Sequence, residues 1–177
     1  LYWGMFHPHH GTPTIAEAAV ELADRTDIHF EFVGEGIDKD AVVDRVEAAS
    51  LSTVTFHGRL PYDELRDTVA SADVCIGTVS GDDLALRSLM NRVCESLAME
   101  KPVITVESPA TDRFESGVHL LKVPPDDPAA LANAIERLAD DPDLGSRLIE
   151  QGNQYFKKNL SKRAIGERLR EVIQSYV

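Results

Sequence analysis

Short runs of β-forming residues alternate with segments of helical periodicity along most of the 177-residue chain. This alternation is typical of repeated β–α units, in which a crossover helix returns the chain to a parallel strand. Strands are expected at residues 1–4, 28–33, 53–57, 74–77, 102–106 and 119–123. Helices are expected at 14–24, 39–49, 62–70, 88–99 and 128–140, followed by 142–158 and 161–176 with no strand between them.

The pattern predicts an α/β fold, namely a Rossmann-like, doubly wound, six-stranded parallel sheet with helices on both faces. We expect one domain over residues 1–177, in which 1–140 form the β–α units and 141–177 the trailing helices. This length suffices for a hydrophobic core without disulfides or metals. Because doubly wound sheets bind ligands beyond the carboxyl ends of their strands, functional residues are expected in the loops that follow the strands.

The chain is strongly acidic, with 30 Asp and Glu against 18 Lys and Arg and a formal net charge of −12. Such a charge repels phosphate backbones and anionic membranes, which excludes nucleic acid and lipid surfaces as general partners. A nucleotide can still bind where helix N-termini and local cations face it. The acidity suits a protein of a high-salt cytoplasm, and an ordinary acidic surface is the equally weighted alternative.

Cys75 and Cys94 lie in apolar stretches without CxxC spacing, so both are expected to be reduced core residues of a cytoplasmic protein. No apolar run approaches the roughly 20 residues that span a bilayer, and nothing resembles a secretory signal. The chain opens at Leu1 within an expected strand, which is typical of a fragment.

The first loop is bracketed by Gly4 and Gly11 and precedes a helix. Glycines there allow backbone N–H groups to approach a phosphate, toward which the helix directs its positive end, although a turn alone can also require them. His7, His9 and His10 have no carboxylate beside them in the loop, so no metal is expected. We expect His10 to face a diphosphate as hydrogen-bond donor and partial cation, a plain polar loop being the alternative.

The second and third strands also end in glycine turns. Gly34 and Gly36 do not form a dinucleotide fingerprint, because the first turn lacks GxGxxG spacing. His57, Gly58 and Leu60 follow the third strand, where the chain either contacts a nucleobase or simply turns.

The fourth loop, residues 77–87, is long and polar, and long loops at the crevice tend to be functional. Asp82 and Asp83 within it are expected to be solvated or to cap a helix rather than to bind a metal.

The helix after the fourth loop carries Arg87, Asn91 and Glu95 at intervals of four residues, which predicts one shared helix face. Glu95 has apolar neighbours, so its carboxylate is either paired with Arg92, three residues back, or reserved for a ligand. Helix geometry by itself favours the ion pair.

The order of these motifs resembles the C-terminal, donor-binding domain of family 4 retaining glycosyltransferases, which have the GT-B fold. The resemblance covers nearly the whole chain and is strongest from Asn91 to Ile104. The other motifs that carry it are Leu1-Tyr2-Trp3-Gly4, Pro8-His9-His10-Gly11, Val33-Gly34-Glu35-Gly36, Val54-Thr55-Phe56-His57-Gly58, Asp63-Glu64-Leu65, Ala72-Asp73-Val74, Val123-Pro124-Pro125-Asp126-Asp127-Pro128 and Leu131-Ala132-Asn133-Ala134-Ile135.

The resemblance implies a nucleoside-diphosphate sugar as substrate, transfer with retention, and no cofactor or metal. It assigns Glu95 to the ribose hydroxyls, Gly4 to the loop under the diphosphate and 57–60 to the base. His10, Arg87 and Arg92 are the candidate catalytic residues, and the candidate substrate-binding residues are Gly4, Gly11, Gly34, Gly36, His57, Gly58, Leu60, Asn91 and Glu95.

The resemblance also implies an N-terminal acceptor-binding domain that this chain lacks, so the fragment alone is expected to be inactive. Any peripheral membrane contact would come through that domain.

Three residues depart from the family pattern. Met5 and His10 stand where many relatives carry Arg and Lys, and Arg87 stands where many carry a sugar-contacting Glu. The alternatives are therefore a non-catalytic sugar-nucleotide-binding module and a nucleotide-sugar epimerase of the same two-domain fold.

Overall fold

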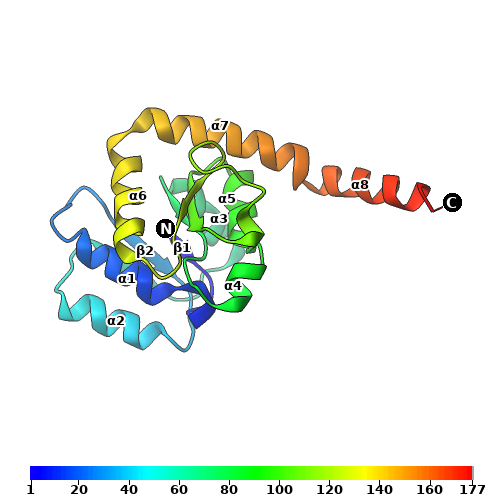
Figure 1. Cartoon of the computed structure of the whole chain (residues 1–177). Helices are drawn as coiled ribbons and strands as arrows, with labels where there is room; N and C mark the ends of the chain where they lie inside the picture. Colours follow the sequence, from blue (N-terminus) through cyan, green and yellow to red (C-terminus); the bar gives the residue numbers. More distant parts are fainter. Residues whose placement is uncertain (177) are drawn as a thin grey trace.

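The structure is a computed structural model that describes residues 1–176 (Figure 1). The elements follow one another in the expected alternation of strands and helices. In chain order they are β1 (Tyr2–Trp3), η1 (Pro8–His10), α1 (Thr12–Glu21), β2 (Phe30–Val33), α2 (Lys39–Ala48), β3 (Val54–His57), α3 (Tyr62–Ser71), β4 (Cys75–Ile76), α4 (Asp83–Arg87), α5 (Asn91–Ala98), β5 (Val103–Val106), η2 (Pro109–Thr111), β6 (Leu121–Val123), α6 (Pro128–Asp140), α7 (Pro142–Asn159) and α8 (Lys162–Gln174).

The strands form two three-stranded parallel sheets, β1-β2-β3 and β4-β5-β6. Leu1 joins them, because its amino group donates to the Val74 carbonyl at 2.8 Å and its carbonyl accepts from the Ile76 amide at 2.9 Å. The strands therefore run in the order 3-2-1-4-5-6, the doubly wound order whose switch point lies between β1 and β4. The α/β fold class is confirmed, with two joined sheets where one continuous sheet was expected.

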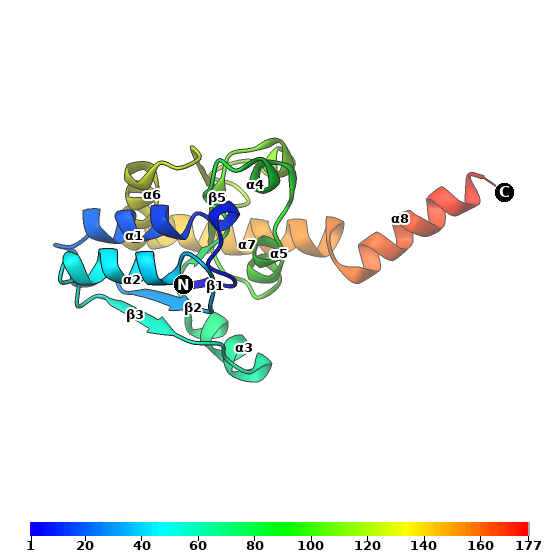
Figure 2. The same cartoon turned by 90° about the horizontal axis from the view of Figure 1, so that it is seen from below.

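Helices cover both faces of the sheets (Figure 2). The main core cluster contains residues of α1, α2 and α6 packed on one face, together with Tyr2 and Phe32. Trp3, Val33 and Cys75 pack with Val69 of α3 on the other. Since successive strand residues point to opposite faces, Tyr2 and Trp3 anchor β1 in different clusters.

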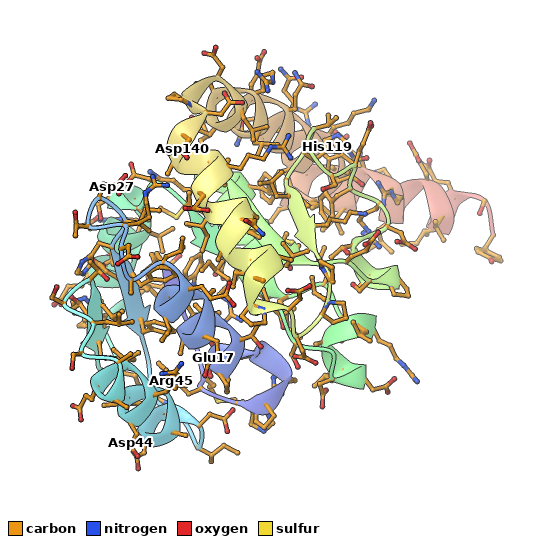
Figure 3. The ribbon with its side chains drawn as sticks, turned by 60° about the vertical axis from the view of Figure 1, so that its left-hand side comes forward. Glu17, Asp27, Asp44, Arg45, His119 and Asp140 are labelled. Atoms are coloured by element: carbon orange, nitrogen blue, oxygen red, sulfur yellow. The ribbon has the colours of Figure 1, made fainter. Side chains whose placement is uncertain are left out.

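Ion pairs link the helices at the surface. Arg45 of α2 donates to both carboxylate oxygens of Glu17 in α1, at 2.6 and 2.8 Å, and the two side chains face each other in Figure 3. This pairing lowers the pKa of Glu17. Arg25 follows α1 and bonds Asp27 and Asp140, which ties that loop to the end of α6.

The trailing helices lie close to their expected bounds. α7 packs against α5, whereas α8 extends away from the rest of the molecule and buries no residue (Figures 1 and 2). Among residues 1–176, no helix is long and apolar enough to cross a membrane. Cys75 is buried and Cys94 half-buried, both as free thiols with a pKa raised by burial.

The helix expected at 88–99 is present as α5, which begins three residues late, and a further short helix, α4, lies within the expected fourth loop. Asp82 caps α4 by accepting from the Leu84 amide at 2.9 Å, so it is one of the capping residues that the sequence allowed. Ser88 and Met90 then adopt extended backbone angles before α5 begins. Arg87 consequently ends α4 and does not share a helix face with Asn91 and Glu95.

Candidate functional site

The first loop lies at the switch point, between the loops that follow β2 and β4. The Phe6 amide donates to the Glu35 carbonyl at 3.0 Å, and the Asp38 amide donates to the Phe6 carbonyl at 3.2 Å. On the other side, the Val79 amide donates to the His10 carbonyl at 3.4 Å. Three loops thus meet at the carboxyl ends of β1, β2 and β4, where the fold class places its ligands.

The loop glycines serve close packing. Gly4 and Gly34 have φ values of +134° and +132°, and a Cβ on Gly34 would overlap the Gly4 carbonyl. A Cβ on Gly36 would overlap the backbone of Phe6, and one on Gly11 would lie 2.8 Å from the Ser80 amide.

The amides of Gly4, Gly11 and Gly34 already donate to carbonyls within the protein, at 2.9, 3.1 and 3.2 Å. These three amides are therefore used within the protein, and a contact between the loop backbone and a phosphate stays a prediction.

His10 is bonded inside the loop. Its Nδ1 lies 2.5 Å from the Met5 carbonyl oxygen, to which the Tyr2 hydroxyl also donates at 2.6 Å. A carbonyl only accepts, so Nδ1 carries the hydrogen and Nε2 is left as an acceptor. Burial and the charge of Arg92 lower the pKa of His10 to about 4. The ring is therefore neutral at neutral pH in this structure, and a contact between His10 and a diphosphate stays a prediction.

Arg92 is a buried cation beneath the first loop. Its Nη1 donates to the Trp3 carbonyl at 2.5 Å, and its guanidinium lies 4.4 Å from the centre of the Tyr2 ring. Nε and Nη2 are buried and have no hydrogen-bond partner among residues 1–176, and burial lowers the pKa of the group. A Cβ on Gly4 would overlap Nη1, so the glycine leaves room for the guanidinium.

Glu95 is exposed beside the end of β1. Its Oε2 accepts from the Trp3 indole Nε1 at 3.2 Å. The ion pair with Arg92, which helix geometry favoured, is not formed within residues 1–176. The carboxylate bonds the Trp3 indole instead, and its contact with a ligand stays a prediction.

The other candidates lie at the rim. Arg87 has a side chain that is 73% exposed and pairs with Asp83 at 2.7 Å. Asn91 is exposed at the first position of α5. Neither is placed against Arg92 or Glu95 by a hydrogen bond within the described residues.

The third loop contributes little free polar surface. His57 Nε2 lies 3.7 Å from Glu31 and has no hydrogen-bond partner. Leu60 packs against the buried cluster around Trp3, and Gly58 is exposed beside Glu35. A base contact by these residues stays a prediction.

Sequence reasoning missed Tyr2 and Trp3 as site residues. An available signal was their chemistry, since a strand that buries a phenol and an indole must supply partners for the O–H and N–H groups. Alternation along β1 sends Tyr2 toward His10 and Arg92 and Trp3 toward Glu95.

No group of three or more metal-ligating side chains occurs within residues 1–176. The ring of His9 lies 4.2 Å, centroid to centroid, from the ring of His7 in a tilted arrangement and 4.2 Å from the ring of His10 in an edge-to-face arrangement. A cavity of about 550 Å³ lies at the amino ends of the strands, where Leu1, Phe30 and Val74 line it. It is therefore separate from the three loops at the carboxyl ends.

The strand order and the meeting of three loops at the strand carboxyl ends define the class: a Rossmann-like α/β domain with a candidate ligand site at its switch point. Residues 1–141 match the family model described as glycosyl transferases group 1. The chain belongs to that family.

Two curated relatives cover nearly the whole chain. The α-D-kanosaminyltransferase of Streptomyces kanamyceticus is 26% identical over 96% of this chain and 43% of its own length. A GDP-mannose-dependent monoacylated α-(1-6)-phosphatidylinositol monomannoside mannosyltransferase of Corynebacterium glutamicum is 26% identical over 95% of this chain and 45% of its own length. The chain thus spans about half the length of these relatives.

Solved structures share the fold. Anabaena HepE in complex with UDP and glucose has a TM-score of 0.83 at 15% identity, over 98% of this chain and 47% of its own. The C-terminal domain of LpcC, a glycosyl transferase group 1 family protein of Francisella tularensis, has a TM-score of 0.76 at 18% identity, over 91% of this chain and 86% of its own.

Proposed function

We propose that this chain is the donor-binding domain of a retaining glycosyltransferase and binds a nucleoside-diphosphate sugar in the crevice between β1 and β4. Family membership supports the transferase class. The relatives include a GDP-mannose-dependent enzyme, and HepE is a structural neighbour with UDP-glucose bound. The acceptor-binding part would lie elsewhere in the whole protein and would close over this domain during turnover.

The observation that carries the proposal is the unpaired guanidinium of Arg92. A buried charge without a carboxylate partner is costly, and an anion placed beside it would offset that cost. The N-terminus of α1 directs a positive dipole toward the same loop. A diphosphate beside the first loop would offset the charge of Arg92 and interact favourably with the α1 dipole. The exposed carboxylate of Glu95 would then accept hydrogen bonds from the ribose hydroxyls.

In this proposal the chain contributes electrostatics and orientation. Arg92 and the α1 dipole stabilise the charge that grows on the departing diphosphate. Neutral His10, with a free Nε2 lone pair, accepts a hydrogen bond from a sugar hydroxyl. Arg87 is held at the rim by Asp83 and becomes available to the diphosphate only if that pair opens.

A non-catalytic sugar-nucleotide-binding module is the second candidate. Exposed Met5 and neutral His10 favour it, because neither supplies a positive charge to a leaving group. Donor hydrolysis by the whole protein separates the two candidates, since an enzyme turns over and a module does not. Glu95→Ala in the whole protein is expected to reduce that hydrolysis.

Isothermal titration calorimetry with UDP-, GDP- and ADP-sugars tests binding. We expect the sugar nucleotides of one nucleobase to give saturable heat of binding. Glu95→Ala should weaken that binding at least tenfold, because a charged hydrogen-bond acceptor is lost. Glu47→Ala, which removes an exposed carboxylate on α2, serves as the matched control and is expected to bind normally. Absence of heat with every donor would refute the proposal.

A further inference from the structure

Trp3 contacts both charged candidates on α5. Its carbonyl accepts from Arg92 Nη1, and its indole Nε1 donates to Glu95 Oε2 at 3.2 Å. The ring is only 5% exposed and packs with Val33, Val69 and Cys75. The core therefore fixes the position of Trp3, and Trp3 in turn fixes two side chains at the crevice.

Arg92 and Glu95 stand three residues apart on one helix, a spacing at which opposite charges usually pair. Such a pair would occupy the carboxylate and neutralise the guanidinium. Instead, two nitrogens of Arg92 are left without partners, and Glu95 bonds the indole. Trp3 bonds the two side chains separately, Arg92 through its carbonyl and Glu95 through its indole.

We propose that Trp3 is the positioning residue of this site, holding Glu95 apart from Arg92 so that Oε1 of the carboxylate faces the ribose. This role rests on the proposed function, in which a nucleotide ribose lies at Glu95. An indole donates one hydrogen and no charge, so the carboxylate keeps its charge and its remaining acceptor sites. A carboxylate oriented before binding also costs less entropy when the ligand arrives.

The contact can be tested without any ligand, because Trp3 is the only tryptophan in the chain. A ¹H–¹⁵N correlation spectrum therefore contains one indole N–H resonance. We expect Glu95→Gln to shift this resonance, because the acceptor of the indole hydrogen bond changes from a carboxylate to a neutral amide. Glu47→Gln is the control and is expected to leave it in place. An indole resonance unchanged by Glu95→Gln would overturn the proposal.

The role in binding is tested with UDP, GDP and ADP and with the 2′-deoxy form of whichever binds. We expect Trp3→Phe, which keeps the backbone carbonyl, to weaken binding about five- to tenfold, since it removes a hydrogen bond to a charged group. It should also reduce the preference for the ribose over the 2′-deoxyribose form, and Glu95→Gln should do the same. The double variant should bind no more weakly than Glu95→Gln alone, because the two residues act as one unit.

The outcomes distinguish a failure of the positioning role of Trp3 from a failure of the proposed nucleotide binding. A purely structural role for Trp3 would weaken both sugar forms equally and leave their ratio unchanged, which would overturn the positioning role alone. A wild-type protein that binds none of the nucleotides would overturn the proposed function and the ribose role with it. If Trp3→Phe does not fold, the indole resonance in wild type and Glu95→Gln still decides whether the contact exists.

Discussion

Adjacent residues of β1 determine the polar contacts of the crevice. Tyr2 lies under His10 and Arg92, and Trp3 bonds Glu95 from the other face of the sheet. Both side chains belong to the core, so the crevice groups are held by packed aromatic rings rather than by flexible loop residues. Aromatic residues with a polar tip suit this role, because the ring is buried while the tip bonds a neighbour.

Gly34 is the residue at which the loops have least room. Gly34→Ala would place a Cβ on the Gly4 carbonyl at a φ of +132°, so we expect a loss of about 3 kcal/mol in the free energy of unfolding. Gly145→Ala is the matched control, because that helical glycine has nothing within 4 Å, and it should stabilise by about 0.5–1 kcal/mol. Urea unfolding measures both; equal effects would contradict the close-packing account.

Arg92→Met tests the unpaired charge. Removing a buried cation without a carboxylate partner should raise the stability of the ligand-free protein by about 1 kcal/mol or leave it unchanged. The rise in melting temperature caused by a bound nucleoside diphosphate should disappear. Arg168→Met, at an exposed arginine of α8, is expected to change neither the stability nor this rise in melting temperature. A large loss of stability in the ligand-free Arg92→Met protein would show that the charge is already compensated.

The pKa of His10, lowered to about 4 from an ordinary value of 6.5, predicts a dependence of stability on pH. The folded protein binds this proton less readily than the unfolded chain, so the contribution is full above about pH 6.5 and is lost as the pH falls toward 4. His10→Asn keeps a donor for the Met5 carbonyl and should show a smaller decline over this window. Burial also lowers the pKa values of His9 and His119, so the stability of both proteins should still fall somewhat with falling pH. An identical loss of stability with falling pH in wild type and His10→Asn would refute the prediction.

At the scale of elements, helix periodicity and capping residues predicted the bounds of most helices. The predicted helices at 128–140 and 142–158 match α6 and α7 closely, because Asp127 and Asp141 cap them and proline follows each cap. The break between α4 and α5 was not predicted. The four-residue spacing from Arg87 to Glu95 fits a single helix, and only the extended backbone at Ser88 and Met90 divides it.

Asp141 and Asp143 offer a matched test of capping at the start of α7. Asp141 accepts from the Leu144 amide at 2.9 Å, whereas Asp143 is exposed in the first turn and makes no such bond. Asp141→Ala should therefore cost about 1 kcal/mol of stability, and Asp143→Ala, with the same change in charge, less than half of that. Thermal unfolding compares the two; equal losses would assign the effect to the helix dipole instead.

At the scale of the whole molecule, the net charge of −12 predicts a response to salt. Screening of repulsion among carboxylates should raise the melting temperature between low and multimolar KCl if the surface is adapted to high salt. Calorimetric scans across that range measure the effect. A melting temperature that does not rise would reject the halophilic interpretation and leave an ordinary acidic surface.

The sequence by itself determined the α/β class and the order of most strands and helices, because periodicity, caps and turn residues act over a few positions. It also singled out Glu95 and Arg92. Only the tertiary structure decided that these two do not pair, that His10 is neutral, and that the loop glycines pack against backbone. Each of those properties depends on burial or on a contact between residues far apart in the chain, such as Trp3 with Glu95.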